Sequence, residues 1–428
     1  MEKKYYQTLQ ETMYHEQLEN GLHVYILPKE GYEKTYGLFS TNFGSIDTTF
    51  TPLGKKERIR VKDGVAHFLE HKMFDMPDGD ASDKFASFGA NTNAFTSSSR
   101  TAYLFSSVDH AYECIDLLLD FVQSLDITEA SVEKEKGIIC QEINMYEDDP
   151  DWRVYFGSIQ NLYQNHPVAV DIAGSVQTVQ ETTKEMLETC YETFYHPNNM
   201  MFIVVGNIDP EKTIERIRKN QEQKHFQPPQ EIDRKKCNEP LEINKKRQII
   251  HMDVQLNKII VSIKVNDILS DSAARLKREL AINTLLDLVF SKSATLYNEW
   301  LEAGIINESF SVNFIQEKDY CFIQMGGDID DVEKLEKKIF DFIKNIHSIE
   351  LSKDNFERVK RKTIGNFITT FNSPEGIANL FSRYYFEGIN ALEIVDAIAN
   401  LQFSDLEEAK KLFKEEYATT CIIQKKES

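Results

Sequence analysis

The chain has 428 residues, 41% of them hydrophobic and 28% charged, an ordinary globular composition that excludes a collagen-like, mostly disordered or disulfide-rich protein. Its 49 basic and 69 acidic residues give a net charge of −20, so the chain would repel nucleic acid unless a basic patch were well segregated, and the sequence has none. At about 150 residues per domain the length predicts two or three domains.

The six cysteines are spread along the chain and no two form a C-x-x-C pair, so we expect free thiols and a reducing compartment. Four of them have apolar neighbours and are expected to be buried: Cys114, Cys140, Cys321 and Cys421. The first 21 residues lack the apolar segment of a signal peptide, and no run of about 18 apolar residues could span a bilayer. We therefore expect a cytoplasmic protein with no membrane partner and no nucleic-acid partner.

In the first half, apolar runs and helical periodicity follow each other from the turn at Asn20-Gly21 onward. The predicted strands are His23–Pro28, Thr35–Asn42, a hairpin of Asn91–Ser97 and Ala102–Ser107, and the apolar run Met200–Gly206. The predicted helices are Val65–Phe74, Asp83–Phe88, Ala111–Ser124 and Ser131–Tyr146.

Residues 225–246 contain three prolines, many charges and little apolar periodicity, which is typical of a linker. The second half repeats the order of the first, and Val132–Ile143 resembles Phe356–Ile368. Its predicted strands are Gln248–Asp253 and Lys258–Val265, and its predicted helices are Ala273–Phe290, Val332–Ile346 and Lys353–Phe371. The pattern predicts an α+β fold of two homologous domains, 1–224 and 247–428, each an antiparallel sheet with helices packed on one face.

The segment His67-Phe-Leu-Glu70-His71 carries the clearest chemical signal. Residues four apart share one face of a helix, so both imidazoles can bind the same metal ion. Glu70 lies beside His71, where its carboxylate could take a proton from water, and the order H-x-x-E-H is that of inverted zincins. These could also be ordinary histidines on a helix face. The flanking apolar residues nevertheless predict a buried helix, in which an unpaired His-Glu-His face would be costly.

A catalytic zinc site needs a third protein ligand and an open fourth position. The candidate is Glu142 in the predicted helix Ser131–Tyr146, and Glu135 lies two turns earlier on the same face. Ile138, Ile139 and Ile143 provide apolar packing on this helix. Taken alone, the helix could equally be a solvated run of Glu and Lys with no special role.

Five segments of the chain, taken in order, resemble the pitrilysin/insulysin family of zinc peptidases, in particular its short bacterial insulinase-like members. They are HFLEHKMF, NAFTSSSRTAYLF, EKEKGIICQEINMY, HPVAVDIAG and YHPNNMMFIVVGN. In that family a Glu well past the second His completes the metal site, and Glu142 lies 71 residues past His71. The resemblance implies one Zn²⁺ per chain on His67, His71 and Glu142, with Glu70 as general base and Glu135 as a second acidic residue that supports catalysis.

The segment Asn93, Ala94, Phe95, Thr96 matches the edge strand on which the family pairs its peptide substrates, and Asn93 would help to position the peptide. Pairing through the main chain would give loose sequence specificity. Without the resemblance, this segment would simply be one strand of a hairpin.

Outside these segments the sequence predicts structural roles. His166-Pro167 and His196-Pro197 lie in turn contexts, so both histidines are expected to pack or cap. The aromatic run that begins at Phe381 has helical spacing and is expected to belong to a core.

The second half has no metal triplet, because its equivalent helix reads RELAINTLL, and Asn366 and Val359 stand opposite Glu142 and Glu135. The family also supplies an Arg and a Tyr, seven residues apart, that hold the substrate carbonyls. In the corresponding segment, Leu296–Phe310, the Arg position reads Leu301, and the Tyr position reads Glu308 or, with a gap, Phe310.

A leucine cannot replace the forked donors of a guanidinium. The resemblance therefore implies a heterodimer with a homologous non-zinc subunit that supplies the Arg/Tyr pair. A homodimer, or use of Arg383 and Tyr384 for this purpose, stays an alternative.

The sequence thus predicts a zinc endopeptidase that hydrolyses peptides or small unfolded polypeptides, as the catalytic subunit of a two-subunit protease. The alternative is a non-catalytic scaffold or binding subunit of the same fold, and the complete set of four matched residues argues against it. A purely structural zinc site would normally have four protein ligands.

Overall fold

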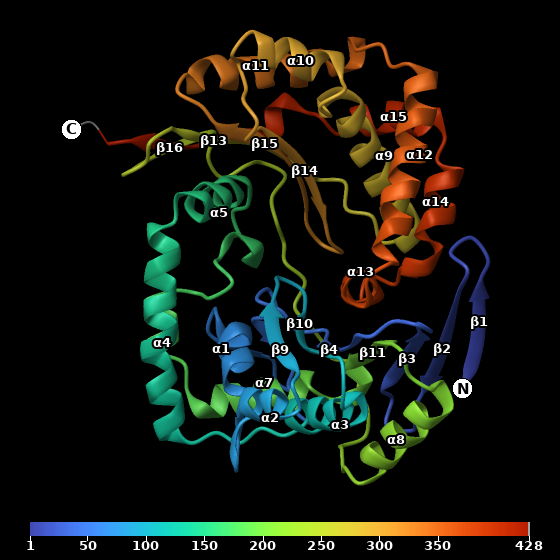
Figure 1. Cartoon of the computed structure of the whole chain (residues 1–428). Coiled ribbons are helices and arrows are strands. Elements are labelled where there is room, and N and C mark those ends of the chain that lie inside the picture. Colours follow the sequence, from blue (N-terminus) through green and yellow to red (C-terminus); the bar gives the residue numbers. More distant parts are fainter. Residues whose placement is uncertain (427–428) are drawn as a thin grey trace.

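The computed structural model describes residues 1–426, and each half of the chain builds one twisted sheet (Figure 1). The first sheet has the order β1-β2-β3-β11-β4-β10-β9, and the second has the order β12-β16-β13-β15-β14. The strands of the first sheet are β1 (Glu2–Tyr6), β2 (Glu11–Gln17), β3 (His23–Pro28), β4 (Thr35–Thr41), β9 (Asn91–Thr96), β10 (Thr101–Ser107) and β11 (Met200–Gly206). Those of the second are β12 (Arg247–Met252), β13 (Lys258–Lys264), β14 (Ser311–Gln316), β15 (Cys321–Asp328) and β16 (Ala418–Lys425).

The helices and minor strands surround these sheets. In the first half they are β5 (Thr49–Phe50), β6 (Ile59–Arg60), α1 (Val65–Lys72), β7 (Asp75–Met76), β8 (Gly79–Asp80), α2 (Ala81–Ser87), α3 (Ala111–Val122), α4 (Glu129–Asp148), α5 (Pro150–Leu162), α6 (Val176–Gln180), α7 (Lys184–Phe194) and α8 (Pro210–Glu222). In the second half they are α9 (Ser272–Phe290), α10 (Thr295–Glu302), α11 (Val332–Asn345), α12 (Lys353–Thr370), α13 (Pro374–Tyr385), α14 (Ile394–Asn400) and α15 (Phe403–Lys410). Five single turns of 3₁₀ helix connect them, at Pro167–Ala169, Pro197–Asn199, Ile346–Ser348, Ala391–Glu393 and Glu415–Tyr417.

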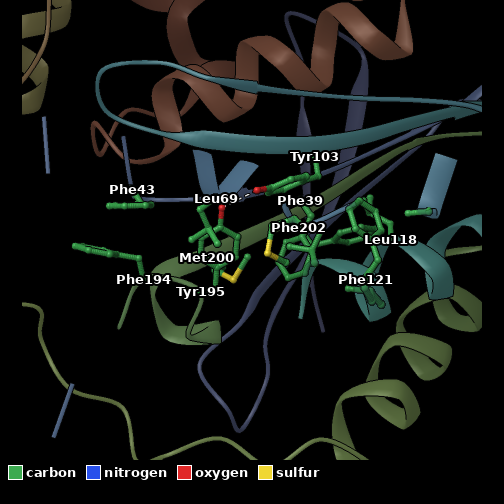
Figure 2. Packing of buried hydrophobic residues seen from close by; sticks show 14 of the residues in the cluster. Phe39, Phe43, Leu69, Tyr103, Leu118, Phe121, Phe194, Tyr195, Met200 and Phe202 are labelled. Carbon is green, nitrogen blue, oxygen red and sulfur yellow. Dashed lines mark hydrogen bonds between the residues drawn. The ribbon is translucent and has the colours of Figure 1, made fainter. Parts of the chain in front are cut away.

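The largest core of the first half lies between its sheet and the helices α1, α3 and α7, as Figure 2 shows from close by. Phe39 and Phe202 meet edge to face from neighbouring strands, and Phe43 stacks on Phe194 of α7. Because Leu69 belongs to the same cluster, helix α1, which carries the H-x-x-E-H segment, is anchored directly in this core.

The opposite face of the first sheet is covered by a helix from the second half. Every residue of β4 and β11 is buried, which explains why Met200–Gly206 reads as a continuous apolar run. Ile377 and Phe381 of α13 share a core cluster with Leu38 of β4 and Ile203 of β11. Figure 1 shows α13 lying over these two strands.

A helix from the first half packs in the reciprocal way on the second sheet. Helix α5 lies against β13 and β16 (Figure 1), and Ser158 accepts a hydrogen bond from Gln324 of β15. The approach is close at Gly157, where an added Cβ would lie 2.6 Å from Cys421 Sγ. Each half therefore completes the core of the other.

The predicted α+β fold with two sheet-and-helix halves is confirmed, and two details differ from the expectation. Each sheet contains one parallel pair, β3 with β11 and β12 with β16, while its other pairs are antiparallel. Helices also cover the second face of each sheet, because α5 and α13 cross between the halves. The proposed boundaries 1–224 and 247–428 stay a prediction.

The segment 225–246 contacts both halves of the chain. The backbone of Arg234 forms an isolated antiparallel β-bridge with Phe50, and its side chain forms an ion pair with Asp47 at 2.8 Å. Glu239 accepts hydrogen bonds from the backbone N–H groups of Gln164 and Asn165 and binds the buried Lys264 at 2.6 Å. This connection therefore has a fixed course between the halves.

The cysteines within residues 1–426 are all free, in line with the expectation. Cys114, Cys321 and Cys421 are buried as predicted, whereas Cys140 is only partly buried and Cys190 is buried in its place. In the same part of the chain, no helix is long and apolar enough to cross a membrane.

Candidate zinc site

Helix α1 carries the H-x-x-E-H segment into the interior. It starts after Gly64, which has φ 90°, and an added Cβ there would lie 2.3 Å from the carbonyl oxygen of Ala173. Only glycine fits both the left-handed conformation and the close approach. Of the three polar residues, His67 and Glu70 are each only 9% exposed and His71 is partly buried.

The structure brings His67, His71 and Glu142 together. Helix α4 begins with a capping box between Thr128 and Ser131 and packs against α1. His67 Nε2 lies 3.7 Å from Glu142 Oε1, and His71 Nε2 lies 3.5 Å from Glu142 Oε2. One ligand atom from each residue falls within 4.8 Å of the other two.

This geometry fits a zinc ion. Two donors that each bind zinc at about 2.1 Å in a tetrahedron are about 3.4 Å apart. The observed distances of 3.5 and 3.7 Å are close to this value. Two imidazoles and one carboxylate are the donor set of many catalytic zinc sites and leave a fourth position open.

Glu135 lies on the far side of the His71 ring from Glu142. Its Oε1 is 3.1 Å from His71 Nδ1, and its Oε2 is 3.6 Å from Nζ of the buried Lys72. A hydrogen bond from Nδ1 to a carboxylate fixes the tautomer and orientation of a histidine whose Nε2 faces a metal. Glu135 can therefore orient His71 without binding a metal itself.

Glu70 is held by the edge strand β9. Thr96 Oγ1 donates a hydrogen bond of 2.5 Å to Glu70 Oε2. Strand β9 pairs with β10 on one side and, among the strands of residues 1–426, with none on the other. Along it, Asn93 is exposed, whereas Ala94, Phe95 and Thr96 are partly buried. The base and the edge that could receive a peptide are thus joined by one hydrogen bond.

Burial and the neighbouring charges shift the pKa values of the side chains in the site. It lowers the pKa of His67 to about 4, and the neighbouring His71 adds to this effect. Burial also raises the pKa of Glu70, against the hydrogen bond from Thr96. The pKa of His71 is raised, because burial, which lowers it, is outweighed by the bond to Glu135 and by the nearby carboxylates. His67 is therefore neutral at neutral pH, as a metal ligand must be.

Sequence reasoning missed Tyr146. Its hydroxyl donates a hydrogen bond of 2.6 Å to Glu142 Oε1, and its ring stacks on Trp152 at 4.7 Å between centroids. Burial, followed by the bond to Glu142, raises the pKa of Tyr146, so the phenol stays protonated. The signal was available, since Tyr146 lies four residues after Glu142, but it marks an interaction only once Glu142 has been identified.

The residues expected to have structural roles have them. Nδ1 of His166 accepts a hydrogen bond from the N–H of Val168, and Nδ1 of His196 accepts one from the N–H of Asn198, so both cap a 3₁₀ turn. Phe381 belongs to the core under α13.

The positions that correspond to the family's Arg/Tyr pair, and the alternative pair Arg383 and Tyr384, lie in the second half. Leu301 is 37% exposed and Phe310 is buried in the second core. Arg383 Nη2 and Tyr384 OH both donate 2.9 Å hydrogen bonds to Glu279, a buried carboxylate on α9. Both side chains are therefore engaged with the carboxylate of Glu279 within the second half.

The fold and the paired His-His-Glu cluster define a protein of inverted-zincin architecture. Two family models match the chain, "Insulinase (Peptidase family M16)" over residues 59–176 and "Peptidase M16 inactive domain" over residues 181–363. The chain is 44% identical over 422 residues to the "Uncharacterized zinc protease YmfH" of Bacillus subtilis, covering 98% of each protein. The chain belongs to the M16, insulinase-type peptidase family.

Two further comparisons extend this result. The crystal structure of a putative M16-like peptidase from Alicyclobacillus acidocaldarius is 31% identical and superimposes with a TM-score of 0.92, covering 97% of this chain and 99% of that one. A protease from Helicobacter pylori, at 21% identity and a TM-score of 0.81, covers 96% of this chain and 99% of its own and shares the fold. The resemblance found in the sequence is confirmed at the level of family and fold.

Proposed function

We propose that the protein is a zinc-dependent endopeptidase acting on peptides or small unfolded polypeptides. The observation that carries the proposal is the convergence of His67, His71 and Glu142 from two helices beside Glu70, which is itself tied to the unpaired edge of β9. The relatives named zinc proteases support it, including YmfH along nearly its whole length.

Each residue of the site would have its own role in peptide hydrolysis. His67, His71 and Glu142 would hold the ion, which when bound lowers the pKa of water and polarises a carbonyl. Glu70 would take the proton of the attacking water on its carboxylate and return it to the leaving amine. Thr96 would keep that carboxylate in place, and Asn93–Thr96 would pair with the main chain of an extended peptide.

Substitution of Glu70 by Gln tests the proposal. The amide keeps the shape of the side chain but cannot accept a proton, so we expect about one zinc per chain by elemental analysis and a loss of peptide cleavage of about 10²–10⁴-fold. His71→Ala serves as the companion variant and should lose most of the zinc. Turnover of Glu70→Gln near the wild-type rate would refute the role of Glu70. Absence of cleavage by the wild-type protein, alone or with a partner, would favour the scaffold alternative.

We further propose that the active form is a heterodimer with a homologous non-zinc subunit. The second half of this chain has Leu301 where the family has its arginine, and Arg383 and Tyr384 are bound to Glu279. The family model described as an inactive domain, which matches residues 181–363, is in line with a metal site confined to the first half.

A further inference from the structure

One hydroxyl group touches the metal-ligand set and has no role in the reaction described above. Tyr146 OH donates to Glu142 Oε1, the oxygen that lies 3.7 Å from His67 Nε2. The other oxygen, Oε2, lies 3.5 Å from His71 Nε2. Tyr146 therefore distinguishes the two oxygens of a carboxylate that faces both histidines.

The ring of Tyr146 is fixed by its surroundings. It stacks on the indole of Trp152, the third residue of α5, with an interplanar angle of 19°. The indole Nε1–H donates in turn to Asp171, whose second oxygen accepts the N–H of Ala173 at 2.9 Å. The carbonyl of Ala173 lies against Gly64, at the start of helix α1. A continuous chain of contacts thus links the hydroxyl to both helices of the site.

We propose that Tyr146 is a positioning residue that makes Glu142 a ligand through one oxygen only. This inference rests on the proposed function. The hydrogen bond from the phenol holds Oε1 toward Tyr146 and uses one of its two lone pairs, so Oε2 is the better donor to the ion. A carboxylate that binds through both oxygens would fill the position that a catalytic zinc site must keep open.

The experiment compares wild-type protein, Tyr146→Phe and Tyr36→Phe after loading each with cobalt(II) in place of zinc. Tyr146→Phe keeps the ring and its stack on Trp152 and removes only the hydroxyl. Tyr36→Phe is the matched control, because Tyr36 accepts one hydrogen bond from Asn379 on the face of the sheet opposite α1. Metal content, thermal unfolding and the visible cobalt spectrum are measured for all three proteins.

We expect about one cobalt per chain in each protein, with the intense visible band of four-coordinate cobalt in the wild type and in Tyr36→Phe. In Tyr146→Phe the band should lose intensity as the second carboxylate oxygen enters the coordination sphere. With zinc, kcat should fall about 10–100-fold, the usual effect of removing a partner of a metal ligand, and KM should change little. A folded Tyr146→Phe that no longer holds cobalt would overturn the one-oxygen proposal, because the hydroxyl would then be needed for Glu142 to bind the ion at all.

Two other outcomes are decisive and distinct. If the wild type binds cobalt and Tyr146→Phe has the same spectrum and kcat, the role of Tyr146 is overturned and the proposed function stands. If the wild type binds no metal, the proposed function itself fails. Trp152→Phe provides a second variant, which keeps an aromatic ring but loses the bond to Asp171, and it should shift the spectrum in the same direction by a smaller amount.

Discussion

At the scale of single residues, Glu135 connects two helices through charge. It sits between the Nδ1 of His71 and the ammonium group of Lys72, which is only 2% exposed. The bond from His71 is the largest cause of the lowered pKa of Glu135, so the carboxylate is ionised at neutral pH. An ionised partner makes the opposite nitrogen of the imidazole a better metal ligand.

We therefore expect Glu135→Gln to weaken zinc binding by about 10–100-fold without removing a ligand, because the amide can still accept the hydrogen bond but carries no charge. Competition with a chromogenic chelator measures the affinity. Glu133→Gln is the control, since Glu133 is an exposed carboxylate on the same helix and pairs with Lys136. Equal zinc affinities for the two variants would contradict a role for Glu135.

The residues of the site differ in how far the sequence could predict them. His67 and His71 are predictable because four residues on a helix place two side chains on one face. Glu142 lies 71 residues further on, and only the packing of α4 on α1 brings it close, so the sequence pointed to it through family resemblance. Tyr146 lies four residues after Glu142 on the same helix, so it could be found only once Glu142 had been identified, and its contact with Glu142 was missed.

At the scale of elements, the strands buried on both faces were the easiest to predict. β11 has the predicted bounds, Met200–Gly206, because a wholly apolar run suits few other places. β1 and β2 went unpredicted because their sequences are polar and their order comes from pairing, of β2 with β3 and of β1 with β2. The sheets on which α5 and α13 pack could not be predicted either, since an amphipathic pattern does not say which sheet a helix will cover.

Two helical glycines, Gly157 of α5 and Gly137 of α4, test whether α5 packs on the sheet of the other half. At Gly157 an added methyl would lie 2.6 Å from Cys421 Sγ in the other half, and such overpacking costs about 1–3 kcal/mol. At Gly137 of α4 an added methyl meets nothing within 4 Å, so alanine should stabilise the helix by about 0.5–1 kcal/mol.

We expect Gly157→Ala to lower the midpoint of thermal unfolding and Gly137→Ala to raise it. Cys421→Ala removes the sulfur that the new methyl would meet. The double variant Gly157→Ala/Cys421→Ala should therefore lose less stability than the sum of the two single changes. Strict additivity would show that α5 does not rest on β16 as described.

At the scale of the whole molecule, the crossing helices make the two halves one body. α5 follows α4 after a single residue, Asp149, so the helix that carries Glu142 runs directly into the helix that rests on the second sheet. The turn after β9 also contacts the second half, where Ser98 Oγ and Tyr320 OH are hydrogen-bonded. The second half therefore supports both α4, which carries the candidate ligand Glu142, and the edge strand β9, although its own sequence contains no H-x-x-E-H segment.

In the proposed heterodimer the Arg/Tyr pair that holds the substrate carbonyls would come from the partner, because the corresponding positions of this chain are Leu301 and Glu308. Leu301 has no hydrogen-bond donor to offer in its side chain, and Glu308 would repel a carbonyl oxygen rather than bind it. An arginine holds such oxygens with planar, fixed donors, so its loss is not repaired by a neighbouring polar group. A homodimer would repeat the same deficiency at both sites.

We therefore expect the purified chain to cleave unstructured peptides slowly on its own. Activity should rise strongly when a homologous subunit is added that lacks H-x-x-E-H but carries the Arg/Tyr pair. Size-exclusion chromatography should show the two chains eluting together, and a partner with its arginine changed to leucine should still bind but fail to activate. Full activity of the lone chain, unchanged by any partner, would contradict the heterodimer and favour a homodimer whose clamp is built from other residues, with Arg383 and Tyr384 the first to be substituted.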